Sequence, residues 1–445
     1  MKTLLKAAKI VCLDAQDMIF EPGYLLVEDG RIQSITTTPP EDFGGTAVDL
    51  GNKLLMPGLV NAHTHTPMVL FRGLAEGHSL FDFDGWYHTI RVVEEVMTPE
   101  MIPAAVLVSC AEMIRTGTTT FADQYFWMEQ IVPAVRQSGL RAALGYGVVE
   151  LGEAAARQRE LDAATKFLQS VAHDPLIQGW VGPHAFFVDN SEAAMEIELD
   201  LAIEFNTGFH IHLSTSGEED RYCQEKYGRT AIQQLAKMGM LQRPILAAHC
   251  LTVPPEDYPL LANAPFSAAI NPSSAMRNAA GVADACGMLD AGINLALGTD
   301  NVTNNNSYDM FKEMQIVGKL MALHHRTPNA LPTRTILHMA TMGGARALGL
   351  ADQIGSLEPG KQADLIALDL DEIGWAPSNG QDVYTALVYA VSGMHVRDVM
   401  VAGEWLYKDG RFQTINYQQA RHDLESSYAQ LAQILKDADE RGNRG

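Results

Sequence analysis

Short hydrophobic runs recur through the middle of the chain, and segments with helical spacing of apolar positions lie between them. Between Pro57 and Gly355 the runs return at intervals of roughly 25–40 residues, and stretches such as Glu100–Arg115 and Arg229–Met238 have one apolar face. Strands that alternate with helices indicate βα units and a parallel sheet. Their number favours a closed (β/α)8 TIM-type barrel over a doubly wound sheet. The runs that we interpret as strands are Leu54–Val60, Gly117–Phe121, Arg141–Val149, Ile177–Val181, Gly208–Leu213, Ile245–His249, Phe266–Ile270 and Ile293–Leu297.

The two ends of the chain have a different pattern, in which short strands are separated by turn dipeptides. Tyr24–Glu28 and Arg31–Ile35 flank Asp29-Gly30, a typical turn of a β-hairpin. Near the other end, Ala363–Leu368 is predicted to be a strand and Asp398–Tyr407 a pair of strands. We therefore expect both chain ends to meet in one small β-sandwich domain.

These patterns divide the chain into three parts. We expect residues 1–57 to supply the N-terminal part of the β-sandwich, residues 58–355 the barrel, and residues 356–445 the C-terminal part. A helix is predicted to close the chain, because apolar side chains share one helical face at Leu424, Tyr428, Leu431 and Leu435. A length of 445 residues suffices for one large barrel and this smaller domain.

Composition narrows the choice of partners and compartment. The formal net charge is −22 at pH 7 and no run of basic residues is present, which argues against nucleic acid or an anionic membrane as partner. The five cysteines are scattered without a C-x-x-C pair, as expected of reduced thiols in the cytoplasm. Lys6 and Lys9 interrupt the apolar N-terminus, so we expect a soluble cytoplasmic protein without a signal peptide.

Residues that can bind a metal follow the predicted barrel strands. In such a barrel the catalytic residues lie at the carboxyl ends of the strands, where the loops converge. His63 and His65 end the first predicted strand, and a spacing of two places both side chains on the same side. Later strand ends carry His212, His249 and Asp300. Any one of these residues alone is usually structural, but their order on successive strand ends indicates a site for a divalent ion such as zinc.

Ordered motifs also show which family the chain resembles. Pro57–His65, followed by His212, His249 and Gly298-Thr-Asp300, is similar to the strand-end motifs of the amidohydrolase superfamily. More narrowly, the chain resembles the branch that contains the methylthioadenosine/S-adenosylhomocysteine deaminases and the s-triazine hydrolases. The motifs that carry this narrower resemblance are Gly182-Pro-His184, Asn305-Asn306, Asp309-Met-Phe311, Gly343-Gly-Ala345 and Ile354–Asp364.

The resemblance implies a role for each residue of the predicted metal site. A single ion, zinc or else iron, would activate a water molecule for attack on a carbon–nitrogen bond. Asp300 would accept the proton of this water, and His249 would orient the water. Binuclear relatives need a carboxylated lysine after the strand that here ends in Glu150, so one ion per chain is favoured. The implied ligands of that ion are His63, His65, His212 and Asp300.

One catalytic position departs from the family. Most deaminases of this branch carry H-x-x-E at the fifth strand, but this chain has Thr215 in place of the glutamate. A threonine hydroxyl cannot act as a general acid at neutral pH, and such help typically contributes about 10²–10⁴-fold. Glu218 or Glu219 could reach back from the next loop, or could instead cap the following helix. Otherwise Asp300 and His249 carry out all proton transfer, or catalysis has been lost.

The positions that contact substrate in the family differ as well. Nucleoside deaminases of this branch hold the ribose with a glutamate directly before a tryptophan, whereas here Gly85 precedes Trp86. Loss of buried hydrogen-bonding groups usually indicates a different ligand. Acidic and aromatic side chains over the barrel mouth would suit a small, planar, cationic molecule. The side chains that we expect to contact substrate are His184, Trp86, Asp84, Asp82, Glu218 and Asn304.

Three functions are compatible with these observations. The first is a metal-dependent hydrolase that releases ammonia from an amidine, guanidine or amide of a small nitrogen-rich compound, such as an amino-s-triazine, a pterin or a guanylurea-like molecule. The alternative is a 5-methylthioadenosine/S-adenosylhomocysteine deaminase, which the overall resemblance favours. The third, of another class, is a catalytically inactive protein of this fold that serves as an interaction partner. The resemblance further implies a homo-oligomer.

Overall fold

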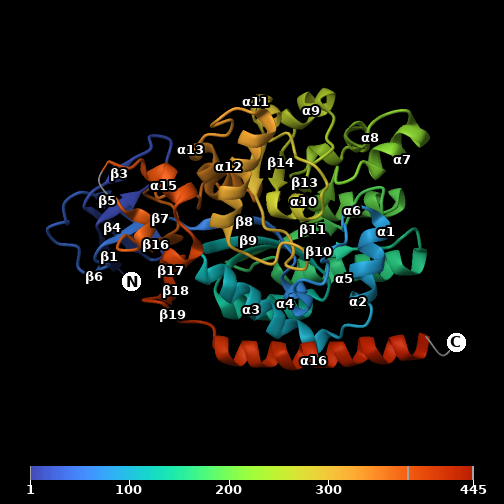
Figure 1. Ribbon diagram of the computed structural model, residues 1–445, viewed down its shortest axis with the longest axis horizontal. Helices are drawn as coiled ribbons and strands as arrows, with labels where there is room; N and C mark the ends of the chain where they lie inside the picture. Colours follow the sequence, from blue (N-terminus) through green and yellow to red (C-terminus); the bar gives the residue numbers. More distant parts are fainter. Residues whose placement is uncertain (1, 378–379, 443–445) are drawn as a thin grey trace.

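The computed structural model describes residues 2–377 and 380–442, and its central feature is a barrel of parallel strands (Figure 1). Within this part of the chain, eight strands are ordered β15-β14-β13-β12-β11-β10-β9-β8, and neighbouring strands are parallel. The (β/α)8 barrel predicted from the sequence is confirmed. Its strands are β8 (Leu59–Thr64), β9 (Thr118–Tyr125), β10 (Arg141–Val148), β11 (Ile177–Pro183), β12 (Phe209–Leu213), β13 (Ile245–His249), β14 (Phe266–Ile270) and β15 (Asn294–Leu297).

The seam between β15 and β8 is bridged at the carboxyl ends of the strands. The backbone N–H of Asp300 donates to the carbonyl oxygen of His63 over 2.9 Å. Beside it, the N–H of Thr299 donates to Oδ1 of Asn61 over 3.0 Å. These hydrogen bonds bring two candidate metal ligands together although the whole barrel sequence separates them.

Helices follow the strands and cover the outside of the barrel. Phe121 and Leu144 on the strands share one buried apolar cluster with Ile114 and Val135 on the helices. The two helices predicted from amphipathic stretches correspond to α3 and α8. The helices of this layer are α3 (Ile102–Arg115), α4 (Met128–Ser138), α5 (Ala154–Val171), α6 (Glu192–Glu204), α7 (Glu218–Tyr227), α8 (Ala231–Met238), α9 (Tyr258–Ala262), α10 (Pro272–Arg277), α11 (Ala285–Asp290), α12 (Met310–His325), α13 (Thr333–His338) and α14 (Gly344–Ala347).

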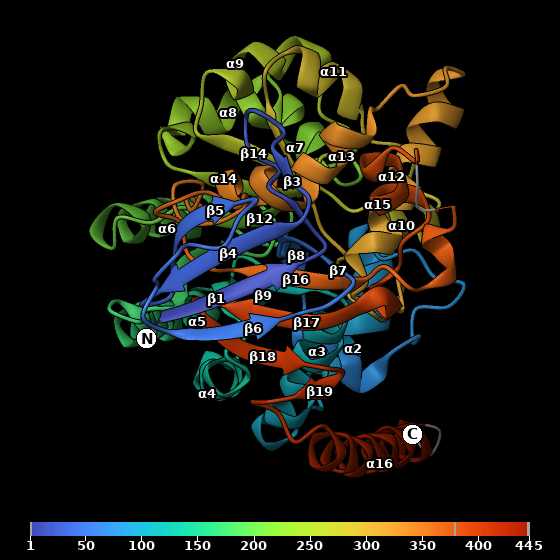
Figure 2. The same cartoon turned by 90° about the vertical axis from the view of Figure 1, so that its left-hand side faces the viewer.

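Strands from both chain ends form a second, smaller region, as the sequence predicts. Figure 2 shows the blue N-terminal strands beside the orange and red C-terminal strands. Leu5, Leu25 and Leu365 share its buried core. One sheet has the order β5-β4-β1-β6, with β1 (Lys2–Ala7), β4 (Gly23–Glu28), β5 (Arg31–Thr36) and β6 (Thr46–Asp49). The other has the order β19-β18-β17-β16-β7-β2-β3, with β2 (Lys9–Val11), β3 (Ile19–Phe20), β7 (Lys53–Pro57), β16 (Leu365–Asp369), β17 (Val396–Val401), β18 (Glu404–Lys408) and β19 (Arg411–Phe412).

The apolar run Leu54–Val60, which we interpreted as one strand, is divided between the two regions. β7 ends at Pro57 in the small sheet, and β8 begins at Leu59 in the barrel. At the junction the chain passes close to β9, since a Cβ on Gly58 would lie 2.1 Å from Oγ1 of Thr119. Both halves of the run are buried, so hydrophobicity alone does not reveal the break.

The two C-terminal helices pack on the barrel side of the molecule. α15 (Val383–Tyr389) contacts α12 and α13, and α16 (Tyr417–Gly442) runs along α3 (Figure 1). The closing helix predicted from its apolar face is therefore present, and Leu431 on that face is buried. Among the helices of the described residues, none alone has the length and hydropathy to cross a membrane, although the bent pair Phe83–Glu94 and Pro99–Arg115 meets that test together.

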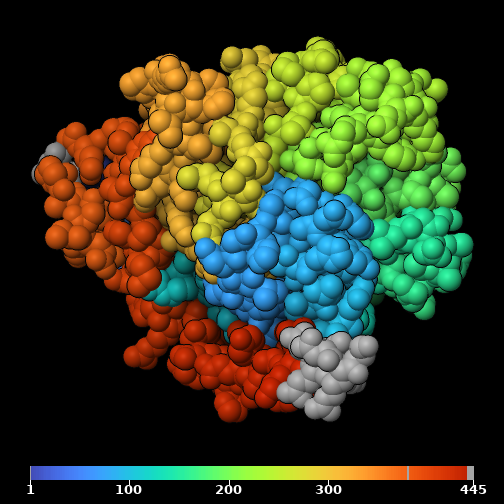
Figure 3. Space-filling model, turned by 45° about the vertical axis from the view of Figure 1, so that its right-hand side comes forward, coloured from blue at the N-terminus to red at the C-terminus, as the bar shows by residue number. Residues whose placement is uncertain are grey.

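The long connection between β8 and α3 lies over the mouth of the barrel. In Figure 3 its light blue atoms fill the middle of one face, beside the yellow and green segments that follow later strands. The connection contains a 3-10 helix (Thr66–Phe71), α1 (Phe83–Trp86), a π-helical turn (Tyr87–Arg91) and α2 (Val92–Glu94). It supplies the outer wall of the candidate site.

Candidate active site

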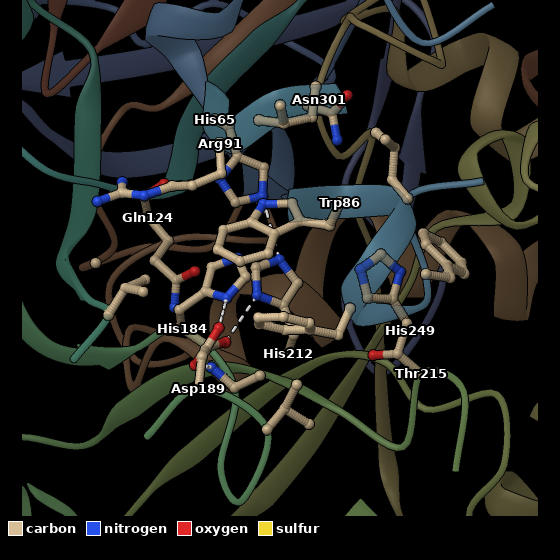
Figure 4. Close-up of a pocket in the computed structure, with 18 of the residues that line it drawn as sticks. His65, Trp86, Arg91, Gln124, His184, Asp189, His212, Thr215, His249 and Asn301 are labelled. Atoms are coloured by element: carbon tan, nitrogen blue, oxygen red, sulfur yellow. Dashed lines mark hydrogen bonds and ion pairs between the residues drawn. The ribbon is translucent and has the colours of Figure 1, made fainter. Parts of the chain in front are cut away.

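A cavity at the carboxyl ends of the barrel strands brings most of the predicted site residues together. Its space, including the open mouth, is about 920 Å³. Figure 4 shows His65, His184, His212 and His249 grouped around the indole of Trp86. Beyond these polar groups the wall is largely apolar, with Leu80, Phe81, Phe83, Ile90, Tyr125, Phe126, Val149 and Val188. A cavity of this size, in which apolar walls surround converging polar groups, is typical of a small-molecule site.

The histidines and the aspartate predicted as metal ligands converge at the inner end of this cavity. Ligand atoms of His63, His65 and His212 lie within 4.8 Å of one another, and so do those of His63, His249 and Asp300. Nε2 of His65 is 3.2 Å from Nε2 of His212 and 3.5 Å from Oδ1 of Asp300. This spacing suits several donors around one ion.

Hydrogen bonds on the far side of each ring orient these histidines. Nδ1 of His65 donates to the carbonyl oxygen of Gln124 over 2.7 Å, and Nδ1 of His212 donates to that of His184 over 2.8 Å. A carbonyl oxygen can only accept, so in both rings Nε2 keeps its lone pair for a metal. Nε2 of His63 is buried and has no hydrogen-bond partner among the described residues. The donor set therefore fits a borderline divalent cation such as zinc.

His210 is a site residue that we did not identify from the sequence. It is buried on β12, and its Nε2 lies 2.8 Å from Nδ1 of His63. Its signal was present, because His210 and His212 repeat the spacing of two seen at His63 and His65. The strand-end rule selects His212 and passes over His210, because His210 lies inside the apolar run.

Electrostatics keep His65 and His249 neutral and Asp300 charged. Burial, reinforced by repulsion from His63, lowers the pKa of His65 to about 3, and burial also lowers the pKa of His249 to about 3. Burial alone would raise the pKa of Asp300, but the neighbouring His63 and His249 hold it below its ordinary value. Neutral imidazoles and an ionised carboxylate are the forms that bind a metal.

The backbone is strained where two of these side chains leave their strands. His249 has φ 77° and Asp300 has φ 61°, both in the left-handed region that non-glycine residues rarely adopt. Such conformations persist only where the surrounding structure enforces them, and they cluster at functional sites. The strain therefore supports a functional role for both residues.

The carboxylate of Asp300 is held by hydrogen bonds on both oxygens. The backbone N–H and the side-chain amide of Asn301 donate to Oδ1 over 2.6 and 2.9 Å, and the hydroxyl of Ser274 donates to Oδ2. The side-chain amide of Asn271 lies 3.3 Å from Nδ1 of His249. These contacts fix the orientation of the two groups nearest the candidate metal ligands.

Thr215 lines the cavity, and so do the neighbouring Glu218 and Glu219. Glu219 is buried and accepts a hydrogen bond from the backbone N–H of Ser214, and burial raises its pKa to about 7. Glu218 accepts from the N–H of Phe83 over 3.3 Å. Helix α7 has no side-chain cap, so the expectation that a glutamate caps it is not met.

His184 and Trp86 both lie in the cavity and are stacked on each other. Their ring centroids are 4.6 Å apart, and His184 is also 4.6 Å from the ring of His212. Nδ1 of His184 hydrogen-bonds to Oδ2 of Asp189. Burial lowers the pKa of His184, but the attraction of Asp189 outweighs it and the net pKa is raised.

Of the three remaining predicted substrate contacts, Asp82, Asp84 and Asn304, only Asp82 lines the cavity. Asp82 lines the cavity and also caps α1, since it accepts from the N–H of Gly85 over 2.8 Å. Asp84 is exposed and does not line the cavity. Asn304 is buried behind Ser274, to which it donates over 3.1 Å, and Asn301 faces the cavity instead.

Comparison with known proteins places this site in a family. The Amidohydrolase family profile matches residues 54–406. A 5-methylthioadenosine/S-adenosylhomocysteine deaminase of Nitratidesulfovibrio vulgaris is 38% identical over 422 residues, which cover 93% of this chain and 94% of that protein. A 5'-deoxyadenosine deaminase of Methanosarcina barkeri is 34% identical over 430 residues, covering 96% and 98%.

Solved structures agree with this placement. An adenosine deaminase of Xanthomonas campestris with bound zinc has a TM-score of 0.90 at 30% identity, covering 97% of this chain and 98% of that chain. A triazine hydrolase variant has a TM-score of 0.86 at 20% identity, covering 96% and 99%, which shows a shared fold alone.

The chain belongs to the amidohydrolase family. It is a metal-dependent hydrolase of the deaminase type that acts on carbon–nitrogen bonds. The alternative of a catalytically inactive interaction protein is not supported, because its relatives over nearly the whole chain are enzymes.

Proposed function

We propose that the protein removes the exocyclic amino group of an adenine nucleoside modified at its 5' position and releases ammonia. The observation that carries the proposal is the convergence of four histidines and Asp300 at the inner end of a largely apolar cavity. The relatives named above support the nucleoside as substrate, so the comparisons favour our alternative over the small nitrogen-rich compound that we ranked first.

The ligands that would hold one zinc ion are His63, His65, His212 and Asp300. Zinc is preferred over iron because the solved relative with 30% identity binds zinc and the donors are neutral imidazoles with one carboxylate. When bound, the ion polarises the reacting groups and makes a water nucleophilic near neutral pH.

Two of the chain's own side chains would manage the proton and the attacking water. Asp300 is ionised and would accept a proton at Oδ2, where the hydroxyl of Ser274 already marks the hydrogen-bonding direction. His249 is neutral and buried, and would orient the water and stabilise charge on the attacked carbon's substituent. Geometry and protonation state both suit these roles.

Proton delivery to the leaving group would also fall to Asp300 and His249. Thr215 offers only a hydroxyl, and Oε1 of Glu219 accepts a hydrogen bond from the backbone N–H of Ser214. A ring that needs protonation before it loses its amine should therefore react more slowly here than in a relative that keeps the glutamate.

A second candidate, hydrolysis of an amino-s-triazine, a pterin or a guanylurea-like molecule, is favoured by one observation. A Cβ at Gly85 would lie 2.1 Å from the carbonyl oxygen of Ser79, so no side chain fits before Trp86 without a backbone shift. In the deaminases that this chain resembles, a glutamate at this position holds the ribose. Here the backbone leaves no room for any side chain at Gly85.

Ammonia release by the zinc-loaded protein separates the two candidates. The panel contains methylthioadenosine, S-adenosylhomocysteine, 5'-deoxyadenosine, an amino-s-triazine, a pterin and guanylurea, with Asp300→Asn as the inactive control. Turnover of at least one nucleoside, at a kcat/KM above that of every other compound, is the expected result. Turnover of only a non-nucleoside would overturn the proposal in favour of the second candidate.

A further inference from the structure

Glu94 is a buried carboxylate in the wall of the cavity, at the end of the segment that covers the barrel mouth. It is 5% exposed on α2 and lines the same cavity as Trp86 and His184. The sequence did not single it out, and it lies outside the metal half of the site. A buried charge in a ligand cavity requires partners, so its partners indicate what it can bind.

The protein's own groups satisfy the Glu94 carboxylate only in part. Its ion pair is with Arg91, whose Nη1 lies 3.5 Å from Oε2, and the same guanidinium also reaches Glu95 at 3.8 Å. Burial raises the pKa of Glu94 above its ordinary value, and Arg91 and the hydroxyl of Tyr125 offset this only in part. An ionised carboxylate can accept about four hydrogen bonds, which leaves acceptor capacity for a ligand.

The position of Glu94 relative to the metal half defines which part of a substrate it can meet. The rings of His212, His184 and Trp86 follow one another at centroid distances of 4.6 Å. Glu94 is near enough to His184 for each to influence the other's pKa. A substrate whose reacting carbon faces the metal ligands would thus extend past Trp86 towards Glu94.

We propose that Glu94 holds the two sugar hydroxyls of the nucleoside substrate by accepting a hydrogen bond from each. This inference rests on the proposed function and names the residue that selects the sugar. A vicinal diol presents two donors at a spacing that one carboxylate can accept together, and it carries no charge that would need a counter-ion at this depth.

If the substrate is a nucleoside, its sugar needs an acceptor from somewhere other than the position before Trp86. Gly85 cannot carry a side chain, because its Cβ would meet the Ser79 carbonyl oxygen at 2.1 Å. Glu94 comes from the same covering segment and brings a carboxylate into the cavity from α2. The acceptor for the sugar is therefore retained but supplied from a different place in the sequence.

The test compares 5'-deoxyadenosine with the same nucleoside lacking its 2'- and 3'-hydroxyls. Wild type should prefer the diol by about 10²-fold in kcat/KM, mainly through KM, because two charge-assisted hydrogen bonds are lost with the hydroxyls. Glu94→Leu should reduce that preference to less than about threefold, and Glu94→Gln should give an intermediate value. On the analogue without the 2'- and 3'-hydroxyls, neither variant should reduce kcat/KM by as large a factor as on 5'-deoxyadenosine.

Glu95→Gln is the matched control, since Glu95 is the next residue, contacts the same arginine and is exposed. It should keep the wild-type preference. Equal losses on both substrates in Glu94→Gln and Glu94→Leu, or a preference that survives in both, would overturn the assignment of Glu94 while leaving the deaminase activity established. If another nucleoside of the panel is the better substrate, that nucleoside and its analogue without the 2'- and 3'-hydroxyls replace this pair. If wild type deaminates no nucleoside of the panel, the proposed function itself fails and the assignment falls with it.

Discussion

The two ends of the active-site cavity are built from different parts of the fold. The inner end takes its side chains from the barrel strands and the residues directly after them, including His63 on β8, His212 on β12 and His249 on β13. The outer end takes Phe83, Trp86 and Glu94 from the connection that covers the mouth. Strand ends place their side chains by the geometry of the sheet, whereas the connection has no such constraint.

This difference separates the residues of the candidate metal site from the residues that would recognise the substrate. At the inner end, every candidate ligand has a partner that fixes its orientation, such as Gln124 behind His65 and His210 behind His63. At the outer end, no side chain fits at Gly85, and the buried carboxylate of Glu94 lines the cavity. Changes at the inner end should therefore affect all substrates, and changes at the outer end should affect some of them.

The largest effect is expected at Asp300. Asp300→Asn removes a ligand charge and the proposed proton acceptor, so kcat should fall by at least about 10³-fold on every substrate of the panel. Initial rates of ammonia release, with metal content measured on the same samples, check this. Asp290→Asn, at an exposed position of α11, is the matched control. Substantial activity in an Asp300→Asn sample that retains its metal would contradict the mechanism.

A smaller effect is expected at His210, which contacts the candidate ligand His63 and is not itself a proposed ligand. His210→Phe removes the hydrogen-bond partner of Nδ1 of His63, and loss of such partners typically lowers metal affinity by about 10–100-fold. Competition with a chelator measures the affinity, and His173→Phe at an exposed position serves as control. An unchanged affinity would show that His63 needs no orienting partner, which would weaken the contrast between the two ends.

The inner end was predictable because each of its residues follows an apolar run. The strand-end rule led to His63, His65, His212, His249 and Asp300, and the structure brings all five together. Asp84 and Asn304 were expected beside them, but one lies on the exposed side of the short helix α1 and the other behind Ser274. Their directions depend on turns after the strands, which hydrophobic periodicity does not describe.

The fold was predictable for the same reason, and its exceptions have physical causes. Alternating strands and helices required a parallel barrel, and hairpin dipeptides marked the small sheets. The break between β7 and β8 was hidden because both sides of Gly58 are buried. Glu94 was missed because α2 follows a π-helical turn, so its direction cannot be extrapolated from Trp86.

Substitution of Thr215 by an acid tests whether the cavity lacks only a general acid. Thr215→Glu should give no gain in kcat/KM on the best substrate, because Glu219 already contributes a buried carboxylate beside this loop and a second one would be repelled. Thr215→Gln controls for size without charge. A tenfold gain in Thr215→Glu but not in Thr215→Gln would show that the site lacks only a general acid.

The smallest effect concerns stability at Glu198, close to the cavity residue Asp189. Glu198 on α6 is fully buried, both of its carboxylate oxygens lack a hydrogen-bond partner among the described residues, and burial together with Asp189 and Glu150 raises its pKa well above the usual value. Because the folded state binds this proton more tightly than the unfolded state, the stabilising contribution is complete at pH values below the unfolded pKa. It declines as pH rises towards the folded pKa.

Glu198→Gln should therefore gain stability relative to wild type as pH increases from 5.5 to 8, by at most on the order of 1 kcal/mol per pH unit. Denaturant unfolding at both pH values measures the difference, and Glu196→Gln at an exposed position of α6 is the control. If the two variants respond alike to pH, the Glu198 carboxyl is not protonated in the folded protein. In that case Glu198 would be a charged group that has a partner, as Asp300 is at the inner end. The contrast between the two ends of the cavity would then lie only in the connection that covers the barrel mouth.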